Sequence, residues 1–180
     1  MKLVANFTAV AAALVSVSAH AFPIAAPGTE GLLVIASGGA VTATYEGNSA
    51  SYSNDLYLVN TGAFVFNNHV NNPGDTAALG TFAAGTELLF KLFVNDTGDS
   101  FFTGPGSRNP DKHDHARVQA GWAPGATLVS FEDLYNGPFD YNDLSFSFTN
   151  TVSGVPEPGI YGLMLAGLVV VGWMARRRKV

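Results

Sequence analysis

The 180-residue sequence contains no cysteine, and this absence excludes several kinds of site. Without thiols the chain has no disulfide bond, thiolate metal site, cysteine nucleophile or cysteine-linked lipid anchor. Charged residues are also scarce, at 13% of the sequence, about half of the ~25% usual in soluble proteins. Because 47% of the residues are hydrophobic, intrinsic disorder is excluded as the main state. The length fits one domain with targeting signals.

The sequence also lacks the short motifs that mark common catalytic sites. It contains no GxSxG elbow, no HExxH zinc motif and no phosphate-binding loop. Glu132 and Asp140 would be a possible pair of glycosidase carboxylates. A glycosidase needs a deep cleft, however, and this small domain has few long loops to build one. We therefore predict that the protein is not an enzyme, with a secreted hydrolase as an alternative.

Basic residues are few in the central part of the chain. Residues 22–158 contain four basic and all fourteen acidic residues, which gives a net charge of −10. The charge of −5 for the whole chain conceals this difference, because the other basic residues lie near the two ends. An acidic surface repels phosphate backbones and attracts cations, so we expect no nucleic-acid partner.

Residues 1–21 have the pattern of a secretory signal peptide. Lys2 gives a positive start, and an apolar core of eight residues follows, which is too short to span a bilayer. Ala19 and Ala21 place small residues at the two positions that signal peptidase reads, so cleavage is expected before Phe22. The alternative is a buried N-terminal helix.

The end of the chain has three parts in order. Residues 153–159 form an extended linker, because Pro156 and Pro158 exclude helix. Residues 160–175 carry no charge and would cover about 24 Å as a helix, against a hydrocarbon core of ~30 Å. Residues 176–180 begin with four basic residues, which hold such an end in the cytoplasm. We predict one C-terminal transmembrane helix with a basic cytoplasmic tail, and the alternative is a buried core helix.

This arrangement resembles the PEP-CTERM sorting signal. The residues that carry the resemblance are Pro156, Glu157, Pro158, Arg176, Arg177, Arg178 and Lys179. The resemblance implies a Gram-negative bacterium and an exosortase, a membrane enzyme that recognises such tails. It also implies a precursor held in the inner membrane by its single C-terminal span. Processing would then move the protein to the outer surface or into the extracellular biofilm matrix.

The segment between these two signals predicts an all-β domain. Short apolar runs separated by Gly, Ser and Asn clusters indicate strands at 32–36, 41–46, 56–60, 87–94, 115–120, 127–132 and 141–149. The run at 87–94 is apolar on both faces, which favours a central strand covered on both sides. We predict a two-layer, jelly-roll-like β-sandwich over residues 22–152.

The last predicted strand alternates between apolar and polar residues. Its period of two predicts that one set faces the core, namely Leu144, Phe146 and Phe148. The other set is predicted to face solvent, namely Ser145, Ser147 and Thr149.

The densest group of oxygen-bearing side chains lies just before this strand. Within twelve residues the chain places Glu132, Asp133, Asp140, Asn142 and Asp143, with no cation among them. These carboxylates repel one another unless they share a cation, and calcium takes 6–8 oxygen ligands in flexible geometry. Zinc prefers nitrogen or sulfur, and magnesium demands stricter geometry. We predict a calcium site that is not an EF-hand, and the alternative is a solvated hairpin with Asx-turns.

The same segment resembles a bacterial extracellular domain family of unassigned function. The residues that carry the resemblance are FEDL at 131–134 and DYNDL at 140–144, with Ser130 in place of the usual preceding glycine. Upstream blocks at 85–93 and 108–116 extend the likeness. The resemblance implies a β-sandwich that binds calcium through these carboxylates, in a surface or adhesin-like protein. It implies no established reaction.

Two weaker signals allow more than one interpretation. Asp96 and Asp99 lie in an acidic segment that favours a hairpin turn over a cation site. His113 and His115 would share one face of a strand, but a third metal ligand is missing, which favours ordinary hydrogen-bonded histidines.

Exposed aromatic residues suggest an alternative function. A carbohydrate-binding module for extracellular polysaccharide would need an exposed aromatic platform, for which the sequence offers Trp122, Tyr135 and Tyr141. We expect instead a non-catalytic cell-surface or matrix protein in which calcium rigidifies the acidic loop.

Overall fold

The computed structural model describes residues 22–156, 168–169 and 174. The predicted signal peptide and the basic tail at 176–180 lie outside these residues. Of the predicted membrane helix at 160–175, Leu168, Val169 and Met174 are described, and all three are helical and exposed. Over the part of the chain that is described, no helix is both long enough and apolar enough to cross a membrane.

Residues 22–156 form a compact arrangement of strands with one short 3₁₀ helix, η1 (Gly106–Arg108). The strands are β1 (Leu33–Ala36), β2 (Gly39–Asn48), β3 (Asn54–Leu58), β4 (Ala63–Asn67), β5 (Thr76–Phe82), β6 (Phe90–Val94), β7 (Ser100–Phe102), β8 (Ala116–Ala123), β9 (Ala126–Phe131), β10 (Leu144–Thr149) and β11 (Thr151–Gly154). Each predicted strand overlaps one of these, and the prediction of an all-β fold is confirmed.

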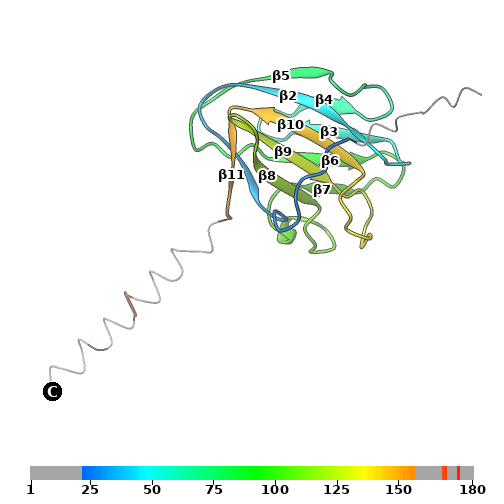
Figure 1. Ribbon diagram of the computed structural model, residues 1–180. Helices are drawn as coiled ribbons and strands as arrows, with labels where there is room; N and C mark the ends of the chain where they lie inside the picture. The colour runs from blue at the N-terminus through cyan, green and yellow to red at the C-terminus, as the bar shows by residue number, and fades with distance from the viewer. Residues whose placement is uncertain (1–21, 157–167, 170–173, 175–180) are drawn as a thin grey trace, which may run out of the picture.

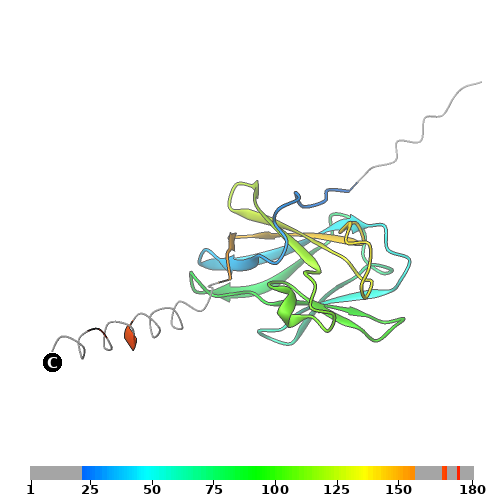
Figure 2. The same cartoon turned by 90° about the horizontal axis from the view of Figure 1, so that it is seen from below.

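The strands form two larger antiparallel sheets and one strand pair (Figures 1 and 2). One sheet has the order β5-β2-β10-β9-β8, and the other has the order β4-β3-β6-β7. The short strands β1 and β11 pair with each other, from Leu33 opposite Gly154 to Ala36 opposite Thr151. Two sheets packed face to face fit the predicted sandwich, while the finer jelly-roll topology stays a prediction.

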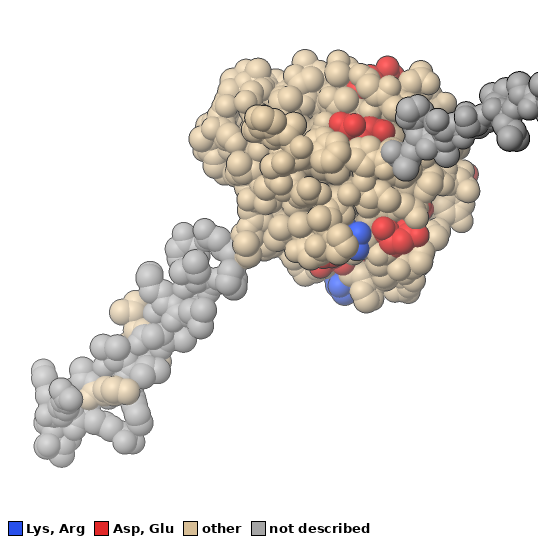
Figure 3. Space-filling view, in the orientation of Figure 1, with Lys and Arg blue, Asp and Glu red and all other residues tan. Residues whose placement is uncertain are grey.

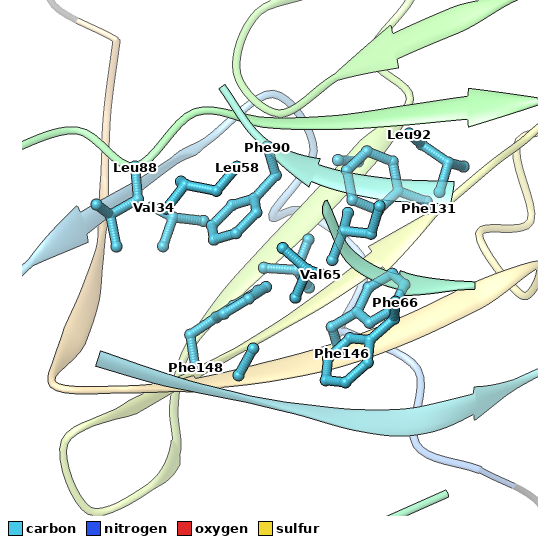
Figure 4. Close-up of a cluster of buried hydrophobic side chains, with 14 of the residues drawn as sticks. Val34, Leu58, Val65, Phe66, Leu88, Phe90, Leu92, Phe131, Phe146 and Phe148 are labelled. Carbon is cyan, nitrogen blue, oxygen red and sulfur yellow. The ribbon is translucent and has the colours of Figure 1, made fainter. Parts of the chain in front are cut away.

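The core lies between the two larger sheets and is rich in phenylalanine (Figure 4). Phe146 and Phe148 of β10 are fully buried, as the alternation predicted. Phe146 stacks on Phe66 of β4 with ring centroids 6.0 Å apart, and Phe148 stacks on Phe90 of β6 at 4.1 Å. Because each pair joins one sheet to the other, aromatic contacts hold the two layers together.

The prediction that Ser145 faces solvent is wrong. Ser145 is fully buried, and its Oγ lies 2.8 Å from the Oγ of Ser130 on β9. The backbone N–H of Ala25 donates to that same Ser130 Oγ at 2.8 Å. Residues 22–30 therefore cover part of the outer face of the five-stranded sheet, over β8 and β9. The alternation within β10 could not reveal this cover.

The prediction that the strand at 87–94 is covered on both faces is also wrong. β6 is central in its sheet, between β3 and β7, but its burial alternates. Phe90, Leu92 and Val94 are buried, whereas Lys91 and Phe93 point to the outer face and are partly exposed. The outer face of the four-stranded sheet thus differs from that of the five-stranded sheet, which residues 22–30 cover in part.

Four strands had no prediction, namely β4, β5, β7 and β11. β7 has three residues, and β5 carries a bulge at Leu79, so neither gives a sustained period of two. β11 extends to Gly154, two residues beyond the predicted domain boundary at 152. The predicted linker at 153–159 therefore begins with two residues that pair with β1.

Candidate cation site

The acidic loop connects β9 to β10, which are neighbouring antiparallel strands. Phe131, the last residue of β9, pairs with Leu144, the first residue of β10. Glu132 and Asp133 leave one strand where Asp143 enters the other, so the two ends of the loop meet. One carboxylate oxygen from each of these three residues lies within 4.8 Å of the others.

A single cation fits this spacing. Oxygen ligands on opposite sides of a calcium ion are about 5 Å apart, because each Ca–O distance is about 2.3–2.6 Å. The three carboxylates also supply oxygen atoms only, the donor type that hard cations prefer.

Two buried oxygen atoms at the site lack a hydrogen-bond partner among the described residues. Glu132 is fully buried, and its Oε2 has no partner, while its Oε1 accepts the N–H of Leu134 at 3.3 Å. Asn54 is also fully buried, and its Oδ1 is likewise unpartnered. Unpaired buried polar atoms cost about 1–3 kcal/mol each. Both oxygens are therefore suited to a ligand that they can coordinate.

Asn54 was not predicted, because it comes from β3 in the other sheet, almost eighty residues earlier in the chain. Its Nδ2 donates to the Oδ2 of Asp133 at 2.7 Å. Its backbone N–H donates to Oδ1 of Asn68 at 2.8 Å, and the Nδ2 of Asn68 donates to the carbonyl of Tyr52 at 2.8 Å. This network fixes Asn54 beside the carboxylates, and it links the two sheets at the site.

The electrostatics of the three carboxylates are unfavourable in the ionised state. Burial raises the pKa of Asp133 to about 6, and the charges of Asp143 and Asp96 act in the same direction. Burial likewise raises the pKa of Asp143 to about 6, and the charge of Glu132 adds to the effect. The pKa of Glu132 is raised by burial and by the charge of Asp140. The cluster therefore needs protons or a cation to offset its charge.

The other two predicted ligands lie outside this cluster. Asp140 is exposed, and its Oδ2 accepts a hydrogen bond from Nδ2 of Asn142 at 2.6 Å. The Oδ1 of Asn142 accepts the hydroxyl of Ser49 at 2.6 Å. These two side chains therefore bond to each other and to Ser49, the residue that follows β2, and they do not converge with Glu132. Asp140 still influences the site, through the effect of its charge on the pKa of Glu132.

The loop folds back over Glu132 and buries it. Gly137 lies so close that an added Cβ would be 2.5 Å from Oε1 of Glu132 and 2.6 Å from Cβ of Leu134. Asn136, Phe139 and Tyr141 have positive φ angles of 52°, 55° and 59°. Such backbone is rarely adopted by non-glycine residues, so the surrounding contacts must hold the loop in this shape.

His115 anchors the base of the loop. It is fully buried, its Nδ1 lies 3.0 Å from the carbonyl oxygen of Glu132, and its ring stacks on Phe101. Its Nε2 lies 2.8 Å from Oδ2 of Asp111, which also accepts the N–H of Asn136 at 3.0 Å. Burial alone would raise the pKa of Asp111, but the hydrogen bonds from His115 and Asn136 lower it to about 2. These contacts fit the interpretation of His115 as a hydrogen-bonded histidine.

The second acidic segment forms the turn between β6 and β7, as predicted. The N–H of Gly98 donates to the carbonyl of Val94 at 2.8 Å. Asp96 accepts the N–H of Ser53 at 2.6 Å, and its charge contributes to the raised pKa of Asp133.

A hollow of about 290 Å³ gives solvent access to the cluster. It is lined by Ser49, Ser51, Tyr52, Asp133, Leu134 and Asp143. A cation can reach two of the three carboxylates through this hollow. Most of the face shown in Figure 3 is uncharged, and its acidic atoms lie in a few separate patches.

Comparison with known proteins identifies the end of the chain. A family model described as the PEP-CTERM protein-sorting motif matches residues 154–179. The chain carries a PEP-CTERM sorting motif. This motif implies an exported protein of a Gram-negative bacterium and processing by an exosortase, as the sequence predicted. No curated protein and no solved structure matches the chain. The comparisons do not confirm the ectodomain family suggested by FEDL and DYNDL, which stays a resemblance.

Proposed function

We propose that the protein is an exported, non-catalytic component of the cell surface or the extracellular matrix. The observation that carries this proposal is the PEP-CTERM motif at residues 154–179. The predicted signal peptide at 1–21 supports it, because export of the N-terminus leaves the β domain outside the inner membrane. The predicted helix at 160–175 would hold the precursor in the membrane until exosortase processing.

The second part of the proposal is a structural calcium site in the β domain. Glu132, Asp133 and Asp143 would bind the ion, and the Oδ1 of Asn54 would be a further ligand. The unpartnered buried oxygens of Glu132 and Asn54 support it, as does the raised pKa of the neighbouring carboxylates. Calcium is favoured over zinc because the cluster lacks nitrogen and sulfur ligands.

Such an ion would join the two sheets. Asn54 belongs to β3 of the four-stranded sheet, whereas the carboxylates flank β9 and β10 of the five-stranded sheet. Bound calcium would offset the repulsion among the carboxylates and fix the loop to the opposite layer. Outside the cell, where calcium is abundant, the domain would then be more stable than before export.

A secreted hydrolase is the second candidate, and one observation favours it. Asp133 and Asp143 line a hollow, and burial raises the pKa of each to about 6, a value suited to a general acid. A structural cation site produces the same shifts when it is free of metal. The two candidates differ in the effect of calcium, which would ionise both carboxylates and remove the general acid.

The sorting proposal predicts the outcome of neutralising the tail. Replacing Arg176, Arg177, Arg178 and Lys179 with glutamine removes the charges that retain this end in the cytoplasm. We expect the full-length precursor to accumulate in the membrane fraction and the surface level to fall at least fivefold, measured by immunoblot of fractionated cells.

The matched control is Lys112→Gln, which removes a positive charge from the β domain and leaves the tail intact. It is expected to be processed normally. If the tail variant reaches the surface in its normal amount and with its normal mass, the tail has no sorting role.

A further inference from the structure

We infer that the outer face of the four-stranded sheet binds a neutral polysaccharide chain. This inference is independent of the cation site. It starts from a row of side chains that crosses the sheet at right angles to the strands. Phe64 of β4 pairs with Tyr57 of β3, Tyr57 pairs with Lys91 of β6, and Lys91 pairs with Phe102 of β7.

The rings in this row present a surface to solvent. Phe64 is 54% exposed, and Tyr57 and Phe102 are partly exposed. Tyr57 meets Phe64 edge to face with centroids 5.8 Å apart, and the Nζ of Lys91 lies 4.5 Å from the Tyr57 centroid. Because both contacts hold Tyr57 in place, the row loses little conformational entropy when a ligand binds.

The spacing and shape of the row suit a sugar chain. Neighbouring strands are about 4.8 Å apart, close to the length of one pyranose unit, so successive sugar rings meet successive strands. The apolar face of a pyranose packs on an aromatic ring, and aromatic side chains supply large contact area with few rotatable bonds.

A second row, with three polar side chains and Phe93, lies beside the aromatic row. Asp55 pairs with Asn67 on one side and with Phe93 on the other, and Phe93 pairs with Ser100. All four side chains are partly exposed. A sugar hydroxyl both donates and accepts hydrogen bonds. The Nδ2 of Asn67 already donates to Asp55 at 2.7 Å and to Ser53 at 3.1 Å. The face still offers both kinds of group, with carboxylate and amide oxygens as acceptors and hydroxyl and ammonium groups as donors.

The aromatic row leads into a hollow of about 430 Å³ at the edge of the sheet. Phe102 and Ser100 belong both to the outer face and to the wall of this hollow. Asp99 and Lys112 also line it, so its wall contains both an acceptor and a donor. A polysaccharide chain that lies along the aromatic row would therefore reach this polar hollow at the edge of the sheet.

The charges of the domain and of this face favour a neutral polymer as the ligand. The net charge of −10 over residues 22–158 repels polyanions. Three of the four basic residues in that range, Lys91, Arg108 and Lys112, lie on this face or line its hollow, and they disfavour a polycation. Asp55 lies on the same face and Asp99 lines the same hollow, so the face has no strong field of one sign. A second copy of the chain would add its own large negative charge.

The test uses the full chain in detergent and native electrophoresis through gels that contain hydroxyethylcellulose, laminarin, dextran or the polyuronate alginate. At least one of the three neutral polymers is expected to retard the protein. Phe64→Ala and Tyr57→Ala should each weaken that retardation at least tenfold. Because Phe64 is more than half exposed, its removal should leave the melting temperature within about 2 °C of the original.

Trp122→Ala is the matched control, since Trp122 is 42% exposed but lies on β8 of the other sheet. It should bind normally. The inference is overturned if no neutral polymer retards the chain, if only alginate does, or if Phe64→Ala binds like the original. The inference would also be overturned if the original chain bound no polysaccharide but self-associated, and if Phe64→Ala abolished that self-association. The face would then bind a second copy of the chain.

Discussion

Calcium at ~10 mM is expected to raise the melting temperature of residues 22–156 by on the order of 10 °C relative to protein in EDTA. A ligand that binds only the folded state stabilises it by ~2.7 kcal/mol at a concentration of one hundred times its dissociation constant. Extracellular calcium modules reach a dissociation constant of about 10⁻⁴ M. The fragment must extend past Gly154, because β11 pairs with β1.

Two isosteric variants separate the site from the rest of the loop. Glu132→Gln removes a buried ligand and should abolish most of the shift. Asp140→Asn is the control, because Asp140 is exposed and bonded to Asn142, and it should keep most of the shift. Magnesium should stabilise less than calcium because it dehydrates reluctantly. Equal melting temperatures in calcium and in EDTA would contradict the cation site.

The pH dependence in EDTA follows from the raised pKa values. Asp133 and Asp143 have pKa values of about 6 when folded, against an ordinary value of 3.8. Between about pH 4 and pH 6 the folded state therefore binds more protons than the unfolded state, and the free energy of unfolding falls as the pH rises. Urea denaturation at pH 4.5 and 7.5 measures this fall. Asp143→Asn and saturating calcium should each reduce it, and a fall that calcium leaves unchanged would contradict the assignment.

Phe146→Ala is expected to lower the free energy of unfolding by about 3–5 kcal/mol, the usual range for a buried phenylalanine. Phe146 is fully buried and contacts three aromatic rings, with centroids 5.6 Å from Tyr45, 6.0 Å from Phe66 and 6.4 Å from Phe131. Its loss leaves a cavity at the junction of the two sheets. Urea denaturation of this variant and of the original protein measures the difference.

The control for this substitution is Ser147→Ala, on the next residue of β10. Ser147 is partly exposed and donates a hydrogen bond to Glu46 at 2.6 Å. Its removal should cost about 1 kcal/mol or less. Similar losses for the two variants would mean that Phe146 does not occupy the centre of the core.

The burial of individual residues could be predicted from the sequence where a strand buries only one of its two faces. Phe146 and Phe148 were assigned correctly because the period of two in β10 depends only on local sequence. Ser145 was assigned wrongly because residues 22–30 cover its face, and local sequence does not contain that contact. β7 was missed because its three residues are too few to show a period.

The candidate site was predictable in part, for a similar reason. Glu132, Asp133 and Asp143 converge because the two ends of a loop between paired strands must meet, which follows from sequence order. Asn54 reaches the site from the opposite sheet, and its position depends on how the sheets pack. Asp140 was predicted as a ligand only because it is acidic and lies in the same loop. It lies away from the two ends of the loop, where the other carboxylates converge.

The central claim is that the chain is exported and then processed through its C-terminal motif. The most direct test is the intact mass of the protein recovered from the membrane fraction and from the surface and medium of the producing cells. We predict a membrane form that begins at Phe22 and retains residues 160–180, and a surface or medium form that begins at Phe22 and lacks them. One mass in every fraction, with residues 1–21 and 160–180 still present, would contradict the account.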